Sequence, residues 1–451
     1  MRKSVHIIKK HEGEKMRTKD ELKRIACEAI DKRAEEIYAF AESVAKEPEF
    51  GFKEVKTAEK FANYLKELDY EPRTGVAITG VVAEKKGAKH NARVAVMGEL
   101  DAILVAGHKD ADPLTNAVHA CGHNAQLAAT LAVAMALHDT DIADDFGGDV
   151  VLMGVPAEEC IEITYRKKLR DEGKLWFISG KQEFLRLGEF DNIDAAIMQH
   201  TAILNDEYKA GATSNNNGFT TKLVNYIGKE AHAGAAPHEG INALNAAMLG
   251  LLAVHTQRET FRDEDHIRIH PIITKGGDIV NVVPADVRIE TYVRGSNTKA
   301  ILDASAKMDR CLQSGALATG AECEIIEIPG YLPAVQCDPL NELMYENLTA
   351  LLGDKAQLIC SGFGGGSSDQ GDVSSVIPSI QSYFTGAVGG LHSENYALVD
   401  KENAIITAAK ALIMLTIDLL YDDASAASDI RKNFKPVFTK EAYLKEWGKI
   451  E

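Results

Sequence analysis

The chain is 451 residues long, more than one hydrophobic core usually organises, so we expect two domains. Hydrophobic residues make up 45% and charged residues 26%, a composition typical of a globular protein and not of a disordered chain. The formal net charge of -17 argues against a nucleic-acid partner, because phosphates require a basic face.

The start of the chain has basic residues but only a short apolar run, too short for the core of a signal peptide. No apolar run approaches the roughly 20 residues that a bilayer span needs, so no membrane partner is expected. The seven cysteines are odd in number and follow no framework spacing, which fits a reducing compartment. These features predict a cytoplasmic enzyme.

The first half of the chain alternates helical and strand patterns. Apolar positions at helical spacing predict a helix over about 19–45 and another near 58–68. Short apolar runs bounded by turn residues predict three strands, at 93–97, 150–153 and 195–198, with a helix at 126–137 among them. Together they indicate an α/β fold, with a mostly parallel sheet flanked by helices on both faces.

A shift to polar residues at 213–218 marks a predicted domain boundary. The elements expected beyond it are a strand, a helix, two strands, a helix and a strand, at 220–227, 242–258, 267–274, 287–293, 298–317 and 322–328. This β-α-β-β-α-β order is typical of a ferredoxin-like arrangement. We therefore expect an inserted α+β domain over 214–329, with 1–213 and 330–451 forming a catalytic domain.

The segment His119-Ala-Cys-Gly-His-Asn124 places Cys121 and His123 one residue apart at the start of an apolar helix. Helix amides and the helix dipole favour a thiolate at such a position, and Asn124 is the predicted N-cap. A buried thiol beside a structural histidine explains the pair equally well when it is taken alone. The pair becomes a candidate metal site only with partners from elsewhere in the chain.

Those partners follow the predicted strands. Glu158 and Glu159 come directly after a buried strand and Pro156, where solvation is not their obvious purpose, and His200 and His392 follow further strands. Ligands of open α/β sheets bind beyond the carboxyl ends of the strands, so these side chains are expected to meet. Adjacent carboxylates can divide labour, one binding a metal ion while the other takes a proton from water.

Five side chains form the candidate ligand set: Cys121, His123, Glu159, His200 and His392. Five exceed what one tetrahedral zinc ion takes and suit two ions that share a bridging water. The ligand types allow zinc, manganese or cobalt. Asp101 follows the first strand and is expected to accept the second ring proton of a ligand histidine.

Several motifs resemble the aminoacylase and carboxypeptidase family of dinuclear metallohydrolases in order and spacing. They are Pro48-Glu-Phe-Gly-Phe52, Gly98-Glu-Leu-Asp-Ala102, His119 to Asn124, Pro156-Ala-Glu-Glu159, Lys229-Glu-Ala-His-Ala233, Asn281-Val-Val-Pro284 and Ser367 to Val373. The likeness covers nearly the whole chain, and the Cys-Gly-His-Asn form is similar to the branch that contains p-aminobenzoyl-glutamate hydrolase.

The resemblance implies two metal ions per subunit, zinc or manganese, bound by the five candidate ligands. It implies that Glu158 is the general base and that the inserted domain is a lid and the interface of a homodimer. His232 would reach the partner's site and stabilise the oxyanion, a contribution of roughly 3 kcal/mol. Asn281 and Arg294 would hold the substrate carboxylate, for which arginine is a suitable bidentate donor.

These lid residues have simpler explanations as well, because His232 could be solvated and Arg294 an ordinary surface charge. Gly365 and Gly366 offer backbone amides to an anion, although a glycine run is equally an ordinary turn. The chain departs from the family at Ile103-Leu104 and at Gln126, which leaves the substrate open.

The sequence therefore predicts a metal-dependent amidohydrolase that cleaves N-acyl or N-aroyl amino acids bearing a free carboxylate. The alternatives are a dipeptidase or aminopeptidase-like exopeptidase of the same fold and a non-catalytic metal-binding dimer. Nucleotide binding by the glycine-rich loop is disfavoured, because the loop lacks the Lys-Ser/Thr of a phosphate-binding loop.

Overall fold

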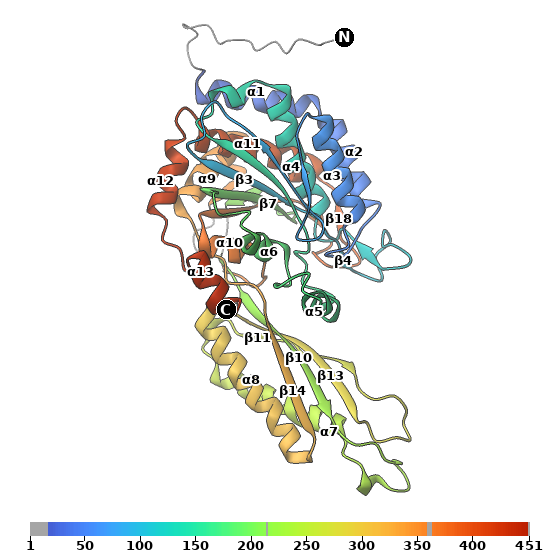
Figure 1. The fold of residues 1–451 in the computed structure, drawn as a ribbon. Helices are drawn as coiled ribbons and strands as arrows, with labels where there is room; N and C mark the ends of the chain where they lie inside the picture. The colour runs from blue at the N-terminus through green and yellow to red at the C-terminus, as the bar shows by residue number, and fades with distance from the viewer. Residues whose placement is uncertain (1–16, 213–214, 359–362, 450–451) are drawn as a thin grey trace.

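The computed structural model describes residues 17–212, 215–358 and 363–449. The basic start of the chain, part of the predicted boundary at 213–214 and Cys360 lie outside these residues. The described chain builds two separate β-sheets, each with its own helices, which lie one below the other in Figure 1.

The larger sheet has the order β1-β2-β6-β3-β7-β17-β8-β15, with β18 beside β17. Its strands are β1 (Arg73–Val76), β2 (Gly80–Lys85), β3 (Arg93–Glu99), β6 (Asp149–Val155), β7 (Ala195–Ile203), β8 (Ala210–Ala212), β15 (Ala356–Leu358), β17 (Ser379–Val388) and β18 (Ala397–Leu398). The central strands β6, β3, β7 and β17 are parallel to one another. Their carboxyl ends therefore meet at one edge of the sheet.

The prediction of a mostly parallel sheet is right for this centre and for the marginal pair β8–β15, but it is wrong for the other marginal pairs. The pairs β1–β2, β2–β6, β17–β8 and β17–β18 are antiparallel, so the sheet is mixed. A short turn joins β1 to β2, and such hairpin connections give antiparallel neighbours.

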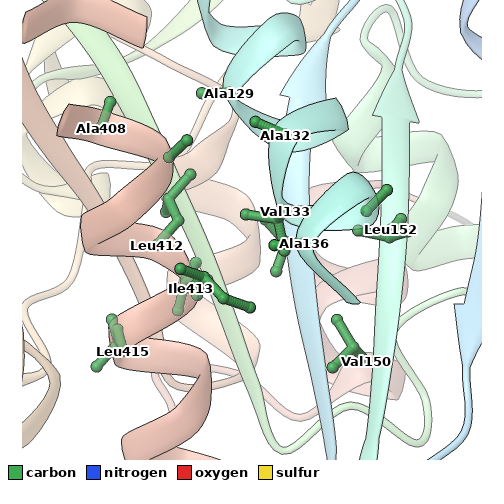
Figure 2. Packing of buried hydrophobic residues seen from close by; sticks show 14 of the residues in the cluster. Ala129, Ala132, Val133, Ala136, Val150, Leu152, Ala408, Leu412, Ile413 and Leu415 are labelled. Atoms are coloured by element: carbon green, nitrogen blue, oxygen red, sulfur yellow. The ribbon is translucent and has the colours of Figure 1, made fainter. Parts of the chain in front are cut away.

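Helices cover this sheet on both faces. They are α1 (Lys19–Lys32), α2 (Ala34–Ala45), α3 (Val55–Glu67), α4 (His123–Asp139), α5 (Ile163–Asp171), α6 (Gly180–Leu187), α9 (Asp338–Leu352), α10 (Gln370–Val376), α11 (Ala408–Leu420), α12 (Ser425–Asn433) and α13 (Lys440–Ala442). Helix α4 is buried from His123 to Leu137 between the sheet and its neighbours α1, α2 and α11. Figure 2 shows Ala132 and Val133 of α4 facing Leu412 and Ile413 of α11.

The helical run 402–420 is long and apolar enough to cross a membrane by composition alone. Within the fold, however, 89% of its most apolar window is buried. It therefore serves as a core helix, which begins with a π-helical turn (Glu402–Thr407) and continues as α11.

The second sheet contains β10 (Gly218–Ile227), β11 (Arg268–Ile269), β12 (Ile272–Lys275), β13 (Asp286–Gly295) and β14 (Glu322–Pro329). All of its pairs are antiparallel in the order β11-β13-β10-β14, with β12 beside β13. Helices α7 (Ala243–Thr256) and α8 (Thr298–Thr319) pack together on one face. The single strand expected at 267–274 is split in two, because Pro271 between the pieces has no N–H to donate.

Two small strand pairs lie beside the site described below. Strands β4 (Ile103–Leu104) and β5 (Ala117–Val118) form one, and β9 (Asn215–Asn216) with β16 (Phe363–Gly364) forms the other.

Candidate metal centre

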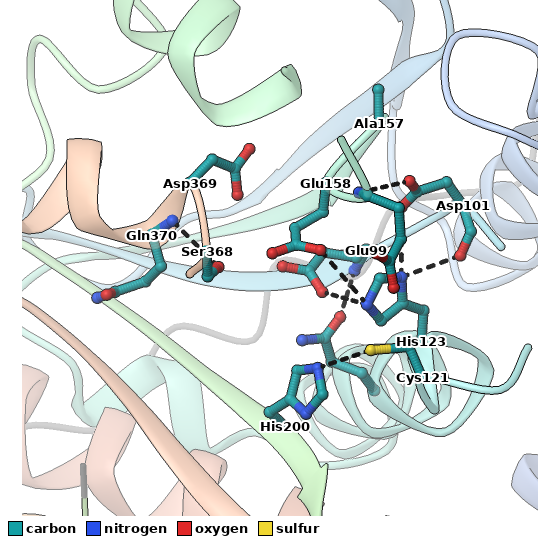
Figure 3. Close-up of polar contacts among 12 residues, drawn as sticks. Glu99, Asp101, Cys121, His123, Ala157, Glu158, His200, Ser368, Asp369 and Gln370 are labelled. Carbon is teal, nitrogen blue, oxygen red and sulfur yellow. Dashed lines mark hydrogen bonds and ion pairs between the residues drawn. The ribbon is translucent and has the colours of Figure 1, made fainter. Parts of the chain in front are cut away.

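The carboxyl ends of three parallel strands and the start of α4 bring the polar candidates together. Asp101 follows β3, Glu158 follows β6, and His200 lies in the second half of strand β7. Cys121 and His123 approach from the start of α4, as Figure 3 shows. The site therefore lies at the sheet edge where the sequence placed it.

Cys121 is the centre of the cluster. Its Sγ lies 3.4 Å from Nε2 of His200 and 3.2 Å from Nε2 of His392. Three groups of three possible ligand atoms each fit within 4.8 Å: Cys121 with His123 and His200, Cys121 with Glu159 and His392, and Glu99 with His123 and Glu158. The Cys121 thiol belongs to the first two groups.

The rings of two histidines are oriented by backbone carbonyls. Nδ1 of His123 lies 2.9 Å from the Asp101 carbonyl oxygen and 3.3 Å from Oδ1 of Asp101, and Nδ1 of His200 lies 2.8 Å from the Thr201 carbonyl. Protonation of Nδ1 leaves Nε2 of each ring as the ligand atom. Asp101 is thus placed against the ring of a candidate ligand histidine.

The donor set fits divalent metal ions. Nε2 of His123 and Oε1 of Glu159 are buried, and their polar neighbours are other candidate ligands or acids of the cluster: Glu99 lies 3.0 Å from the first atom and His392 3.0 Å from the second. Thiolate, imidazole and carboxylate together are ligands that zinc and similar ions accept. Burial, followed by the charge of Glu159, raises the pKa of the Cys121 thiol well above its usual value, and a bound cation would reverse this.

Glu158 lies beside the cluster and is only 7% exposed. Its Oε2 is 3.9 Å from Nε2 of His123, and it belongs to neither ligand group that contains Cys121. Burial, then the charges of Glu99 and Glu159, raises the pKa of Glu158 well above its ordinary value. Burial also raises that of Glu159, but the hydrogen bond and charge of His392 outweigh it and the net pKa is lowered.

Sequence reasoning missed a buried charge network behind Glu158. Lys181, at the start of α6, forms ion pairs with both Glu99 and Asp369, and all three side chains are fully buried. Oε2 of Glu99 also lies 3.0 Å from Nε2 of His123. A charged residue closing the apolar strand β3 was the only local signal, since Lys181 and Asp369 come from distant segments.

The predicted N-cap of α4 is wrong. The helix begins at His123, and Gly122 precedes it with a φ of 87°. A side chain there would be strained, and its Cβ would lie 2.7 Å from Cβ of Thr201. Asn124 is instead inside the first turn, where its Nδ2 donates to the Ala41 carbonyl at 3.3 Å.

A cavity of about 700 Å³ opens in front of the cluster. Its walls include Glu158, Gly365, Gly366 and, from the second sheet, Arg294. Nη1 of Arg294 donates to Oγ of Ser367 at 2.7 Å, and the guanidinium lies over the rings of Phe219 and Tyr292. Among the described residues no carboxylate forms an ion pair with Arg294, so its charge faces the cavity unneutralised.

His232 and Asn281 do not reach this cavity within one chain. They lie together, since His232 bridges to Val282 and the Ala233 N–H donates to the Asn281 carbonyl. Phe219 and Arg294 lie at one end of the ten-residue strands β10 and β13, and His232 and Asn281 lie beyond the other end. Because a ten-residue strand spans roughly 30 Å, about this distance separates His232 and Asn281 from the cavity.

Comparison with known proteins agrees with the fold. Residues 95–417 match the model of peptidase family M20/M25/M40. The chain belongs to this family, and it is therefore an enzyme that hydrolyses amide bonds.

Two curated relatives are informative. The chain is 28% identical to the Xaa-Arg dipeptidase of Mus musculus over 445 residues, which cover 94% of each protein. It is 29% identical over 238 residues to a Haemophilus influenzae homolog of one p-aminobenzoyl-glutamate hydrolase chain, covering 49% of this chain and 50% of the relative.

Solved structures share the fold. A putative aminohydrolase from methicillin-resistant Staphylococcus aureus has a TM-score of 0.70 at 21% identity, covering 88% of this chain and 100% of its own. A dinuclear metal-binding M20 peptidase from Bacillus subtilis has a TM-score of 0.62 at 19% identity, covering 85% and 98%.

Proposed function

We propose that this enzyme is a dinuclear metal amidohydrolase that releases an amino acid from its N-acyl or N-aroyl conjugate. The observation that carries the proposal is the shared position of Cys121 between two ligand groups, with Glu158 next to them. His123 and His200 complete one group, while Glu159 and His392 complete the other. Zinc or manganese suits this set.

Two divalent ions bound there would polarise the amide carbonyl and make water more acidic. Glu158 takes the proton from the attacking water and delivers it to the amine that leaves. Its carboxylate accepts no hydrogen bond from the described residues, so it is available for this transfer. Asp101 keeps the ring of His123 in the tautomer that a ligand needs.

The substrate carboxylate binds at Arg294 in this proposal. The guanidinium is oriented by Ser367 and two aromatic rings, and it has no carboxylate partner in the described chain. The backbone of Gly365 and Gly366 lines the same cavity. A conjugate such as p-aminobenzoyl-glutamate would place its carboxylate on Arg294 and its amide at the cluster.

A dipeptidase is the second candidate. The similarity to Xaa-Arg dipeptidases over 94% of the chain favours this candidate, because the name of those relatives states that they act on dipeptides. A dipeptide also carries a free carboxylate, so the same cavity would serve. The difference lies in the acyl side, where a dipeptide brings a free amine.

We further propose that 214–329 forms a lid through which two chains pair, the rest of the chain being the catalytic domain. Helix α7 exposes Met248, Leu249 and Leu252, and strand β12 exposes Ile272 and Ile273 at the sheet margin. A second copy covering this apolar surface would bring its His232 and Asn281 toward the neighbouring cavity.

Substrate profiling of the metal-loaded protein tests the proposal. N-acyl amino acids, p-aminobenzoyl-glutamate and dipeptides with C-terminal arginine are compared by kcat/KM, each beside its carboxamide-terminated analogue. We expect the free carboxylate to raise kcat/KM in every class. Preference for free-amine dipeptides over N-acyl compounds would establish the dipeptidase instead, and equal rates with carboxamides would refute carboxylate recognition.

A further inference from the structure

We propose that Arg166 and the segment Pro48–Glu54 form a clamp that positions Glu158, an inference that rests on the function proposed above. The side chain of Glu158 makes no hydrogen bond within the described structure, and its charged contact with Nε2 of His123 is 3.9 Å long. Its location is set by the backbone on either side of it. The clamp consists of the distant groups that hold this backbone.

The loop after β6 is held at each of its peptide groups by a side chain. The Ala157 N–H donates to Oε1 of Glu54 at 2.7 Å, and the Glu159 N–H donates to Oδ2 of Asp101 at 2.8 Å. The hydroxyl of Tyr331 donates to the carbonyl of Glu158. Ala157 has a φ of 57°, an unfavourable conformation for an alanine that these bonds maintain.

Arg166 closes the clamp from α5. It is 1% exposed, and its guanidinium donates to the carbonyls of Ala157, at 3.2 Å, and of Glu159. A third bond, of 2.5 Å, reaches the carbonyl of Ile178. The carbonyls on both sides of Glu158 are therefore fixed by one rigid planar group.

A buried cation hydrogen-bonded only to carbonyls is an expensive way to stabilise a loop. Arg166 forms no direct ion pair in the part of the chain that the structure describes, and the charges of Asp101 and Glu54 favour its cation without bonding to it. A neutral side chain would avoid the cost of desolvating the charge. We infer that the guanidinium is present because it presents the catalytic carboxylate with a fixed geometry.

The motif Pro48-Glu-Phe-Gly-Phe52 is explained by the same contacts. A Cβ on Gly51 would lie 2.5 Å from Nη2 of Arg166 and 2.8 Å from Cα of Ala157, so only glycine fits. The ring of Phe52 lies under the guanidinium at 5.4 Å, and Oε2 of Glu54 accepts from Thr79 at 2.7 Å. Gly51, Phe52 and Glu54 do not line the cavity, yet each lies against Arg166 or the Ala157 backbone.

The test compares Arg166→Met with Arg170→Met, its matched control. Arg170 is on the same helix, but it stacks on Trp176 and forms no hydrogen bond with the loop among the described residues. For each protein we would measure kcat, KM, bound metal and amide hydrogen exchange of the peptide covering residues 155–160. Arg166→Lys, which keeps the charge without the planar fork, is included as a partial rescue.

We expect Arg166→Met to lower kcat by about a hundredfold, because a displacement near 1 Å costs this much, with KM within about threefold and metal retained. Amide exchange at 155–160 should be fastest in Arg166→Met, intermediate in Arg166→Lys, and unchanged in Arg170→Met. Unchanged exchange, or a kcat within about threefold of Arg170→Met, overturns the clamp.

Tyr331→Phe provides the same test should Arg166→Met not fold, since it removes one hydroxyl from the clamp. Its expected loss in kcat is about tenfold, with the same faster exchange, because one hydrogen bond is lost. Failure of the proposed function is distinguishable, because the wild-type protein would then cleave no amide in the panel. The exchange measurement would still decide whether Arg166 holds the loop.

Discussion

Glu158 has a side chain that accepts no hydrogen bond from the described residues, and it lies outside both ligand groups that contain Cys121, as expected of a proton carrier. Glu158→Gln preserves its shape and removes its basicity. We expect kcat to fall by about a thousandfold, within the range for lost general base catalysis. Metal content and KM should stay near the wild-type values. Kinetics with metal analysis check this, with exposed Glu172→Gln as control, and an unchanged kcat would disprove the assignment.

Arg294 is the residue on which carboxylate recognition depends. For Arg294→Gln we expect KM for carboxylate substrates to rise by about tenfold to a hundredfold, since a hydrogen bond to a charged group contributes about 1.5–3 kcal/mol. Carboxamide analogues should be cleaved as by the wild type. Arg288→Gln is the control, because exposed Arg288 lies on the same strand but is paired with Asp286. Equal effects on both substrate types would contradict the proposal.

His119 contributes to the acid sensitivity of the fold. Both of its ring nitrogens are buried without hydrogen bonds in the described structure, and burial together with the charge of His123 lowers its pKa to about 3. Its unfolded pKa is about 6.5, so the folded state binds fewer protons between these values. Stability is therefore complete above about pH 6.5 and is lost as the pH falls toward 3.

His119→Asn removes this titration. We expect the melting temperature of the wild type to fall more steeply than that of the variant between about pH 7 and pH 5. Exposed His270→Asn should follow the wild type. Parallel curves for all three proteins would show that His119 does not contribute.

The ligands could be predicted because each carries a local signal. Cys121 and His123 lie at the start of an apolar helix, and Glu158 and Glu159 follow a buried strand. Polar side chains at such positions are unfavourable unless they bind a partner. Arg166, Lys181 and Tyr331 carry no such signal. Their roles depend on contacts with residues that are distant in sequence, and a single sequence does not display those.

Among the elements, α6 is tied to the core by an ion pair network. Lys181 lies between Glu99 of β3 and Asp369 before α10, and all three are fully buried. Lys181→Met leaves two buried carboxylates without their cation, which typically costs about 3–5 kcal/mol. We expect a clearly lower melting temperature. Exposed Lys174→Met is the control, and an equal melting temperature for the two variants would show that Lys181 is dispensable.

Helices and strands were predictable where apolar residues recur at the spacing that places them on one face of the element. Helix α7 and strands β10 and β13 show such patterns, and the structure places each within a few residues of the prediction. The direction of the marginal strands β1, β2 and β18 was not predictable, because pairing is decided by which edge remains free. The split of β11 from β12 did have a signal in Pro271.

At the scale of the whole molecule, the C-terminal segment joins the two sheets where the chain returns from the second one. Nε1 of Trp447 donates to the Gly330 carbonyl at 3.1 Å, and Lys449 pairs with Glu327 of β14. Gln182 of α6 donates to the same Gly330 carbonyl. The junction is therefore held from both the catalytic sheet and the C-terminus, which limits how freely a lid could move.

The distance between His232 and the cluster leads to a prediction about the assembly, namely that His232 acts in the site of a partner chain. If His232 serves the site of a partner chain, His232→Ala and Glu158→Gln are each inactive as pure dimers but complement each other when mixed. A mixed dimer then contains one site with an intact Glu158 in one chain and an intact His232 in the other. Random pairing should restore about a quarter of the wild-type activity in the mixture, and purified mixed dimers should show about half.

Co-expression with two different tags isolates the mixed dimers for this measurement. Glu158→Gln paired with Glu159→Ala is the control, because a site assembled from one chain's loop cannot be repaired by the other's. No recovery in the His232→Ala mixture would mean that His232 acts within its own chain or takes no part in catalysis. Since one chain keeps His232 roughly a strand length away from the cluster, recovery would also establish that the dimer is the catalytic unit.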